Sequence, residues 1–269
     1  MKEWLLFTKI FADKTPRTVA QHAAELGFDG VDVLVRDGYT VSTQDVAQGL
    51  VQAHSVFREY GLSVPLVTTD IASPSDPLVQ PVFRTCAELE IPYVRLGWWR
   101  YDKSRDHGEQ WTAAQRDIEL LAKTAAEYGL TVLLQMHGGA LHQSPTRIRL
   151  LLDGVQAGNV GIYFDPGNMV KQEGFEQWPL AVEMVKDRLK MVGVKNGVWR
   201  RVAERPARWQ AAWVGLDEGL VPWDEVFSLL RAAGYAGPLS FHSHYEDKSF
   251  DEAMEQIAAD LVYAKSLLA

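Results

Sequence analysis

The spacing of short apolar segments is the feature that most restricts how this chain can fold. Runs of β-branched or apolar residues begin near residues 3, 30, 63, 92, 131, 159, 189 and 238, and segments with helical spacing of apolar residues lie between them. Gly27, Gly61 and Gly129 follow helical segments, where glycine favours a C-terminal stop. Eight strand–helix units in about 250 residues are typical of a (β/α)8 barrel. We therefore predict an α/β fold, a single (β/α)8 TIM-barrel domain over residues 1–269.

A doubly wound open sheet is the main alternative to the barrel. That fold usually has fewer strands and a glycine-rich phosphate loop after its first strand. Here the first apolar run leads into residues 11–14 (FADK), which contain no glycine. The sequence therefore disfavours a nucleotide-binding sheet.

Charge and composition restrict the partners of the chain. Its 269 residues include 27 Lys and Arg against 35 Asp and Glu, a net charge of −8. This balance argues against nucleic acid or an anionic membrane as a partner. No segment reaches the ~18 apolar residues of a membrane span, and the N-terminal apolar run is too short for a signal peptide. The single cysteine, Cys86, cannot form an internal disulfide, so we expect a cytoplasmic protein with a buried structural thiol.

One connection is much longer than the others. The apolar runs near residues 189 and 238 leave residues 197–221 as a long loop, on the barrel face that carries active sites. The loop contains three tryptophans and four arginines, which suit sugar faces and anionic or hydroxyl groups. We expect Trp199 and Trp213 to bind substrate. The alternative is an oligomer contact, and a homodimer is a possible assembly.

Polar residues end the last four apolar runs. Parallel barrel strands are usually apolar on both faces, so polar side chains within them stand out. The carboxyl ends of such strands meet at one mouth of the barrel, where active sites lie. The polar residues predicted to converge there are Gln135, His137, Asp165, Lys195, Ser240, His242 and His244.

This set predicts a metal site and a proton-transfer group. Gln135, Asp165 and His242 are the candidate ligands of a divalent metal, Mn, Zn, Co or Mg, because amide and carboxylate oxygens and imidazole suit these ions. His242 or His244 would move a proton. The alternative for each histidine is a hydrogen-bonded structural role.

Two buried cations and two aromatic rings complete the predicted site. Lys195 is expected to stabilise negative charge on a substrate oxygen, with a purely structural pairing to Asp165 as the alternative. Arg95 lies in an apolar run and is expected to face the substrate. We also predict that Trp99 and His137 contribute to substrate binding.

Several segments together resemble the xylose isomerase-like barrel superfamily, the sugar phosphate isomerase/epimerase group. They are residues 27–32 (GFDGVD), 128–137 (YGLTVLLQMH), 165–168 (DPGN), 192–196 (VGVKN), 215–223 (GLDEGLVPW) and 234–242 (GYAGPLSFH). The resemblance covers nearly the whole chain. It implies a TIM barrel that acts on small sugars.

The resemblance also implies a metal site, but with altered ligands. Members similar to this chain bind a divalent metal through Glu, Asp, His and Glu on strands five to eight. These positions fall on Gln135, Asp165, Gly193 and His242, so only the aspartate is retained. The two glutamates are also the acid/base pair of the ketose epimerases. Because Gln135 cannot exchange a proton at neutral pH, that two-carboxylate mechanism is not expected here.

The resulting functional prediction is a metal-assisted sugar isomerase or epimerase that transfers a proton next to a carbonyl of a sugar or keto-sugar. One alternative is a lyase or dehydratase acting on a 3-keto sugar. Another is a non-catalytic sugar-binding barrel that has lost the usual metal site. An endonuclease of the same superfamily is disfavoured by the net charge of −8.

Overall fold

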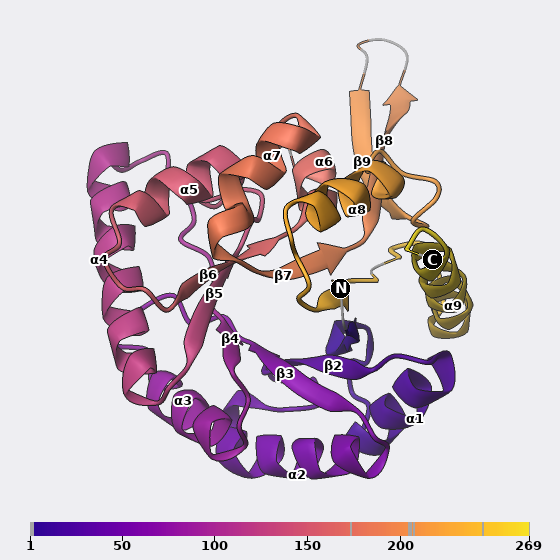
Figure 1. Cartoon of the computed structure of the whole chain (residues 1–269), viewed down its shortest axis with the longest axis horizontal. Coiled ribbons are helices and arrows are strands. Elements are labelled where there is room, and N and C mark those ends of the chain that lie inside the picture. Colours follow the sequence, from indigo (N-terminus) through magenta and orange to yellow (C-terminus); the bar gives the residue numbers. More distant parts are fainter. Residues whose placement is uncertain (1–2, 173, 204–205, 207, 244, 269) are drawn as a thin grey trace.

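The computed structural model describes residues 3–172, 174–203, 206, 208–243 and 245–268. Eight parallel strands close into a barrel in the order β1-β10-β7-β6-β5-β4-β3-β2, and helices surround it (Figure 1). This closed order confirms the (β/α)8 prediction and excludes the open sheet. The barrel strands are β1 (Trp4–Phe7), β2 (Gly30–Leu34), β3 (Ser63–Thr68), β4 (Tyr93–Arg95), β5 (Thr131–Gln135), β6 (Val160–Phe164), β7 (Leu189–Val194) and β10 (Leu239–Phe241).

Most of the described helices begin at a residue whose side chain caps them. Thr15 accepts a hydrogen bond from the backbone N–H of Thr18 at the start of the first helix, and Ser249 forms a capping box at the start of the last. Short 3-10 turns at 8–10, 43–45 and 186–188 lie among the longer helices. The helices are α1 (Pro16–Leu26), α2 (Val46–Glu59), α3 (Val79–Glu88), α4 (His107–Glu127), α5 (Pro145–Asp153), α6 (Pro166–Lys171), α7 (Trp178–Val185), α8 (Trp223–Ala232) and α9 (Phe250–Ser266).

Alternation of side chains along the strands divides the apolar core in two. A large cluster packs between the strands and the surrounding helices. A small cluster is formed by Leu5, Leu66, Leu133, Tyr163 and Met191, which come from five different strands. This second cluster fills the barrel below its carboxyl-end mouth. The side chains above it therefore rest on a packed floor.

The long connection is a β-hairpin, not the irregular loop that its spacing indicated. Strands β8 (Asn196–Ala203) and β9 (Arg208–Val214) pair antiparallel, and the hairpin projects from the barrel (Figure 1). Its base contacts α6, where the indole N–H of Trp199 donates to the backbone oxygen of Val170 at 2.8 Å. This hydrogen bond and the packing of β8 against α6 hold the base of the hairpin on the barrel.

Two further expectations concern membrane-spanning helices and the single cysteine. In the described residues no helix is long and apolar enough to cross a membrane. Cys86 is buried in α3, and burial raises the pKa of its thiol to about 12. A thiol with that pKa stays protonated and unreactive, which agrees with the structural role expected for Cys86.

Candidate active site

A cavity of about 110 Å³ lies at the carboxyl-end mouth of the barrel. Phe7 of β1 and Trp98, which follows β4, contribute apolar surface to it. Because the strands end together, residues far apart in the sequence meet around this single space. The residues proposed from the sequence that line it are Arg95, Gln135, His137, Lys195, Trp213 and His242.

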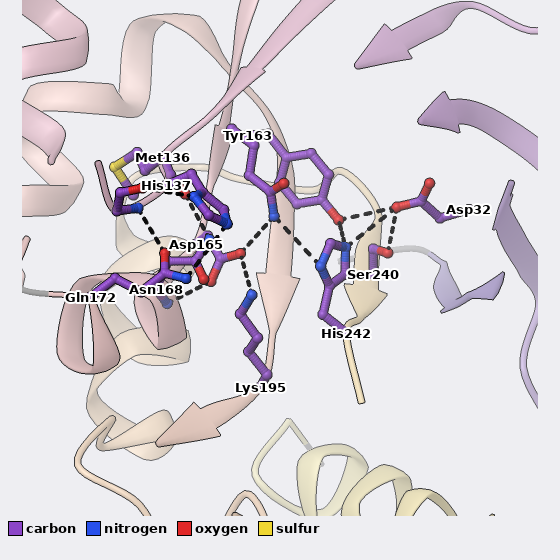
Figure 2. Close-up of polar contacts among 12 residues, drawn as sticks. Asp32, Met136, His137, Tyr163, Asp165, Asn168, Gln172, Lys195, Ser240 and His242 are labelled. Carbon is purple, nitrogen blue, oxygen red and sulfur yellow. Dashed lines mark hydrogen bonds and ion pairs between the residues drawn. The ribbon is translucent and has the colours of Figure 1, made fainter. Parts of the chain in front are cut away.

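Asp165 lies fully buried where β6 passes into α6. Its Oδ1 accepts the backbone N–H of Asn168 at 2.8 Å, which caps the helix. Its Oδ2 accepts from Gln135 Nε2 at 2.6 Å and lies 3.0 Å from Lys195 Nζ (Figure 2). Both carboxylate oxygens are therefore engaged by the protein.

The turn after Asp165 requires glycine at position 167. A β-carbon there would lie 2.4 Å from Cγ of Lys195. The stem of Lys195 consequently rests directly on the turn that follows β6. This close approach fixes the distance between the ammonium group and Asp165.

Lys195 is a buried cation at the end of β7. Burial lowers the pKa of its amine, and the charge of Asp165 opposes that change. Its Nζ also lies 4.5 Å from the ring centroid of Trp213, a cation–π distance. The ammonium group is thus held at the cavity by a carboxylate and an aromatic face.

His242 follows β10 and is oriented by two aromatic neighbours. Phe7 stacks on the imidazole with 4.2 Å between ring centroids, and Tyr163 Oη lies 2.5 Å from Nε2. The Tyr163 hydroxyl donates its hydrogen to Asp32 Oδ2 at 3.2 Å. The contact with Tyr163 therefore needs the hydrogen of Nε2–H, which leaves Nδ1 with a lone pair.

The Nδ1 atom of His242 points toward Gln135, and both residues line the cavity. Nδ1 lies 3.5 Å from Gln135 Nε2, in agreement with an acceptor at this position. Burial lowers the pKa of the imidazole well below its ordinary value, with Lys195 as a further cause. His242 is therefore neutral at physiological pH, the state that a base requires.

Asp32 lies at the end of the contacts that run from His242 through Tyr163, on the side away from Asp165 (Figure 2). It lies fully buried in β2 and accepts from Thr68 Oγ1 at 2.6 Å and Ser240 Oγ at 2.9 Å, in addition to Tyr163. Burial raises the pKa of its carboxyl group to about 6, against the effect of these hydrogen bonds. Sequence reasoning missed Asp32 and Tyr163, although polar residues within buried strands are the signal that identified Gln135.

The remaining predicted residues lie elsewhere. Trp99 packs edge-on against His142 and does not line the cavity, because Trp98 occupies that place. Trp199 is bound to the backbone of α6 and also lies off the cavity lining. His244 lies outside the described residues, so its proposed role stays a prediction.

The three predicted metal ligands meet, but they do not fit a divalent ion as they stand. Asp165 supplies the single carboxylate, and its Oδ2 already faces the ammonium of Lys195. A β-carbon at Gly193 would lie 3.0 Å from that same oxygen, so the position faces the site yet brings no ligand. The described residues contain no group of three or more His, Cys, Asp or Glu placed to hold a metal. A divalent charge beside a paired ammonium would be repelled rather than bound.

Comparison with known proteins places this geometry in a family. The family described as "Xylose isomerase-like TIM barrel" matches residues 20–266. The chain belongs to this family. Gln135 and Gly193 lie within the matched residues.

Individual relatives are more distant. An inosose dehydratase from Erwinia tasmaniensis is 30 % identical over 145 residues, which are 51 % of this chain and 48 % of that protein. The chain thus spans about half the length of this curated relative in the match.

Solved structures share the fold at low identity. A xylose isomerase-like TIM barrel protein from Mycobacterium smegmatis in complex with magnesium has a TM-score of 0.74 at 18 % identity, covering 100 % of this chain and 98 % of that one. The 3-keto-D-glucoside 4-epimerase of E. coli has a TM-score of 0.75 at 14 % identity, covering 99 % and 100 %. At these identities the likeness shows the fold alone.

Proposed function

We propose that this protein is a carbohydrate enzyme that transfers a proton next to the carbonyl of a sugar or keto-sugar. The observation that carries the proposal is the neutral imidazole of His242, which lines one small cavity together with the ammonium of Lys195. A base and a cation in one small cavity are what enolate formation requires. The similarity to an inosose dehydratase supports a keto-sugar as the substrate class.

In the proposed first step, His242 Nδ1 removes a proton from the carbon beside the carbonyl. The electron pair of the broken C–H bond moves to the carbonyl oxygen and forms an enolate. Asp32, whose Oδ2 is 3.5 Å from Nε2, stabilises the imidazolium that results. The charge therefore develops between groups that are already oriented.

Lys195 receives the negative charge in this scheme. An N–H of its ammonium group donates to the enolate oxygen while Asp165 holds the side chain in place at 3.0 Å. A resident divalent metal would supply Lewis-acid polarisation of the carbonyl. Because the donor set does not fit such an ion, we assign the positive charge to Lys195.

The second step distinguishes the possible reactions. Imidazolium can return its proton to the former carbonyl carbon while the proton of the adjacent hydroxyl group moves to the enolate oxygen, which shifts the carbonyl and completes an isomerisation. Alternatively, it can protonate a departing β-hydroxyl group, which releases water as the carbonyl re-forms. Inversion at one carbon needs a second acid on the opposite face, and Gln135 cannot supply that proton. We therefore favour isomerisation or dehydration over epimerisation.

Solvent deuterium exchange tests the shared first step. The protein is incubated in D₂O with keto-inositols, 3-keto-glucosides, ketohexoses, ketohexose 6-phosphates and ketohexuronates, and NMR follows the carbon-bound hydrogen beside the carbonyl. We expect catalysed exchange or release of water for at least one of these compounds. Binding without exchange by any of them would overturn the proposal in favour of a non-catalytic sugar-binding barrel.

A further inference from the structure

The half of the mouth formed by β1–β4, here called the first half, carries an unbalanced set of cations. Lys9 follows β1, Arg36 follows β2 and Arg95 ends β4. All three line the cavity together with Lys195, and its described lining includes no Asp or Glu. The proposed chemistry uses only Lys195, so the other three cations have no assigned role.

Arg95 is the most constrained of these cations. Its side chain is only 2 % exposed, yet its described contacts include one hydrogen bond, from Nη1 to the backbone oxygen of Leu96 at 3.0 Å. Nε has no hydrogen-bond partner, and Nη2 is 3.8 Å from Asp70 Oδ1. A buried guanidinium is normally paired and hydrogen-bonded, so donors are left for a ligand.

The neighbouring charges do not complete the pairing. Arg36 binds Asp70 through two nitrogens at 2.7–2.9 Å, so this one carboxylate serves two guanidinium groups. Lys9 has no carboxylate within ion-pair distance in the described part of the chain. Burial lowers the pKa of Lys9, and Lys195, Arg36 and Arg95, which line the same cavity, lower it further, whereas Asp70 opposes the change.

The charges at the mouth therefore leave a positive excess. Four cations line the cavity, while Asp70 and Asp165 neutralise two of them. Asp32 lies deeper, behind Tyr163 and Ser240, and adds at most one negative charge. Among the residues that the structure describes, at least one positive charge therefore remains without a counterion.

We propose that the substrate carries an anionic group, a carboxylate or a phosphate, which Lys9, Arg36 and Arg95 bind while its carbonyl lies between Lys195 and His242. The inference rests on the proposed function for the placement of the carbonyl. Guanidinium groups offer paired donors that match the oxygens of both anions.

The barrel order gives the substrate its orientation. Lys9, Arg36 and Arg95 come from β1, β2 and β4, whereas Lys195 and His242 come from β7 and β10. The cavity adjoins a wider hollow of about 440 Å³, and Lys9 and Trp213 line both spaces. The remainder of an acidic sugar can therefore extend into this wider hollow while its anion lies on the first half.

Binding measurements with matched sugars test this inference. Isothermal titration calorimetry at constant ionic strength compares D-glucuronate, D-glucose 6-phosphate and D-glucose on the full chain. We expect at least one anionic sugar to bind about tenfold or more tightly than D-glucose, and the tighter of the two identifies carboxylate or phosphate as the anion. Equal or weaker binding of both anionic sugars would overturn the inference.

Substitutions at the half-buried rim locate the anion. Lys9→Met and Arg36→Gln are each expected to weaken binding of the preferred anionic sugar about tenfold and to leave D-glucose binding unchanged. Lys103→Met, in the exposed connection before α4, is the control and should bind like the wild type. Unchanged anion binding in both rim variants would contradict the assignment.

Binding and exchange fail independently. Anion binding without deuterium exchange would remove the proposed chemistry and keep the anion site. Exchange with neutral keto-sugars, without tighter binding of anionic sugars, would keep the proposed chemistry and remove the anion site.

Discussion

Lys195 and Arg95 are both buried cations at the mouth of one barrel, but their surroundings differ. Lys195 has a carboxylate at 3.0 Å and an aromatic face at 4.5 Å. Arg95 also faces an aromatic ring, that of Trp98 at 4.6 Å, but it has one backbone hydrogen bond, a carboxylate at 3.8 Å that it shares with Arg36, and an Nε without a hydrogen-bond partner. The difference shows that the buried cation of the second half of the mouth, formed by β5, β6, β7 and β10, has its counterion before a ligand arrives, whereas the buried cation of the first half shares one.

Each arrangement suits a different task. Groups that stabilise a transition state act best when the protein already holds them in place. Groups that recognise a substrate gain specificity when the ligand supplies their missing partner. Asp32 joins the two halves, because it belongs to β2 but orients Tyr163 of β6 and Ser240 of β10.

Replacing the base should give the largest effect on the second half. His242→Gln removes the only proton acceptor assigned to the first step, so we expect deuterium exchange to fall by about 10²–10⁴-fold. Binding of anionic sugars on the first half should persist. His54→Gln on α2 is the matched control. A His242→Gln variant that exchanges at the wild-type rate would remove His242 from the mechanism.

Replacing the cation of the second half should have a slightly smaller effect. Lys195→Met keeps the length of the stem but removes the donor to the enolate oxygen, so exchange should fall by about 10²–10³-fold. The loss should appear in kcat rather than in KM, because the anion is bound elsewhere. Lys123→Met on the surface of α4 is the control. A change confined to KM would instead make Lys195 a binding residue.

The sequence predicted the fold and the second half of the mouth well, for one physical reason. Parallel strands in a barrel end together, so polar residues at the ends of apolar runs must meet. Gln135, Asp165, Lys195 and His242 follow this rule, and the structure brings them into one network. Their catalytic roles stay predictions.

Other features depend on contacts that no local pattern contains. Asp32 and Tyr163 touch across the barrel, and strand spacing does not tell which side chains reach each other there. Trp98 rather than Trp99 lines the cavity because β4 ends at Arg95, beyond which strand alternation no longer predicts direction. Lys9 lies in a 3-10 turn, where helical and strand patterns both fail.

The buried histidine His142, which follows β5 and packs against Trp99 after β4, predicts a pH effect on stability. His142 is buried beside Trp99, and burial lowers the pKa of its imidazole to about 3 from the ordinary 6.5. Below about pH 6.5 the His142 imidazole binds a proton in the unfolded chain but stays neutral in the folded chain. The free energy of unfolding therefore falls as the pH falls. Relative to His142→Leu, the wild type should lose about 2–3 kcal/mol between about pH 7 and pH 4.5. Urea unfolding at the two pH values measures this, and parallel stability curves would show that His142 is protonated in the fold.

Metal removal should have the smallest effect and tests the charge balance of the second half directly. Because Lys195 already supplies the cation at Asp165, treatment with EDTA followed by Mn²⁺ should leave the exchange rate unchanged. Calorimetric titration with Mn²⁺ should likewise show no saturable binding to the wild type. The double variant Gln135→Glu/Lys195→Met adds a carboxylate and removes the ammonium, so it should gain Mn²⁺ binding that a further Asp165→Asn change abolishes. Tight Mn²⁺ binding by the wild type that is lost in Asp165→Asn would contradict this prediction, because it would show that the ion displaces Lys195 from Asp165. Both halves of the mouth would then need a bound ligand or ion to complete their charge pairing.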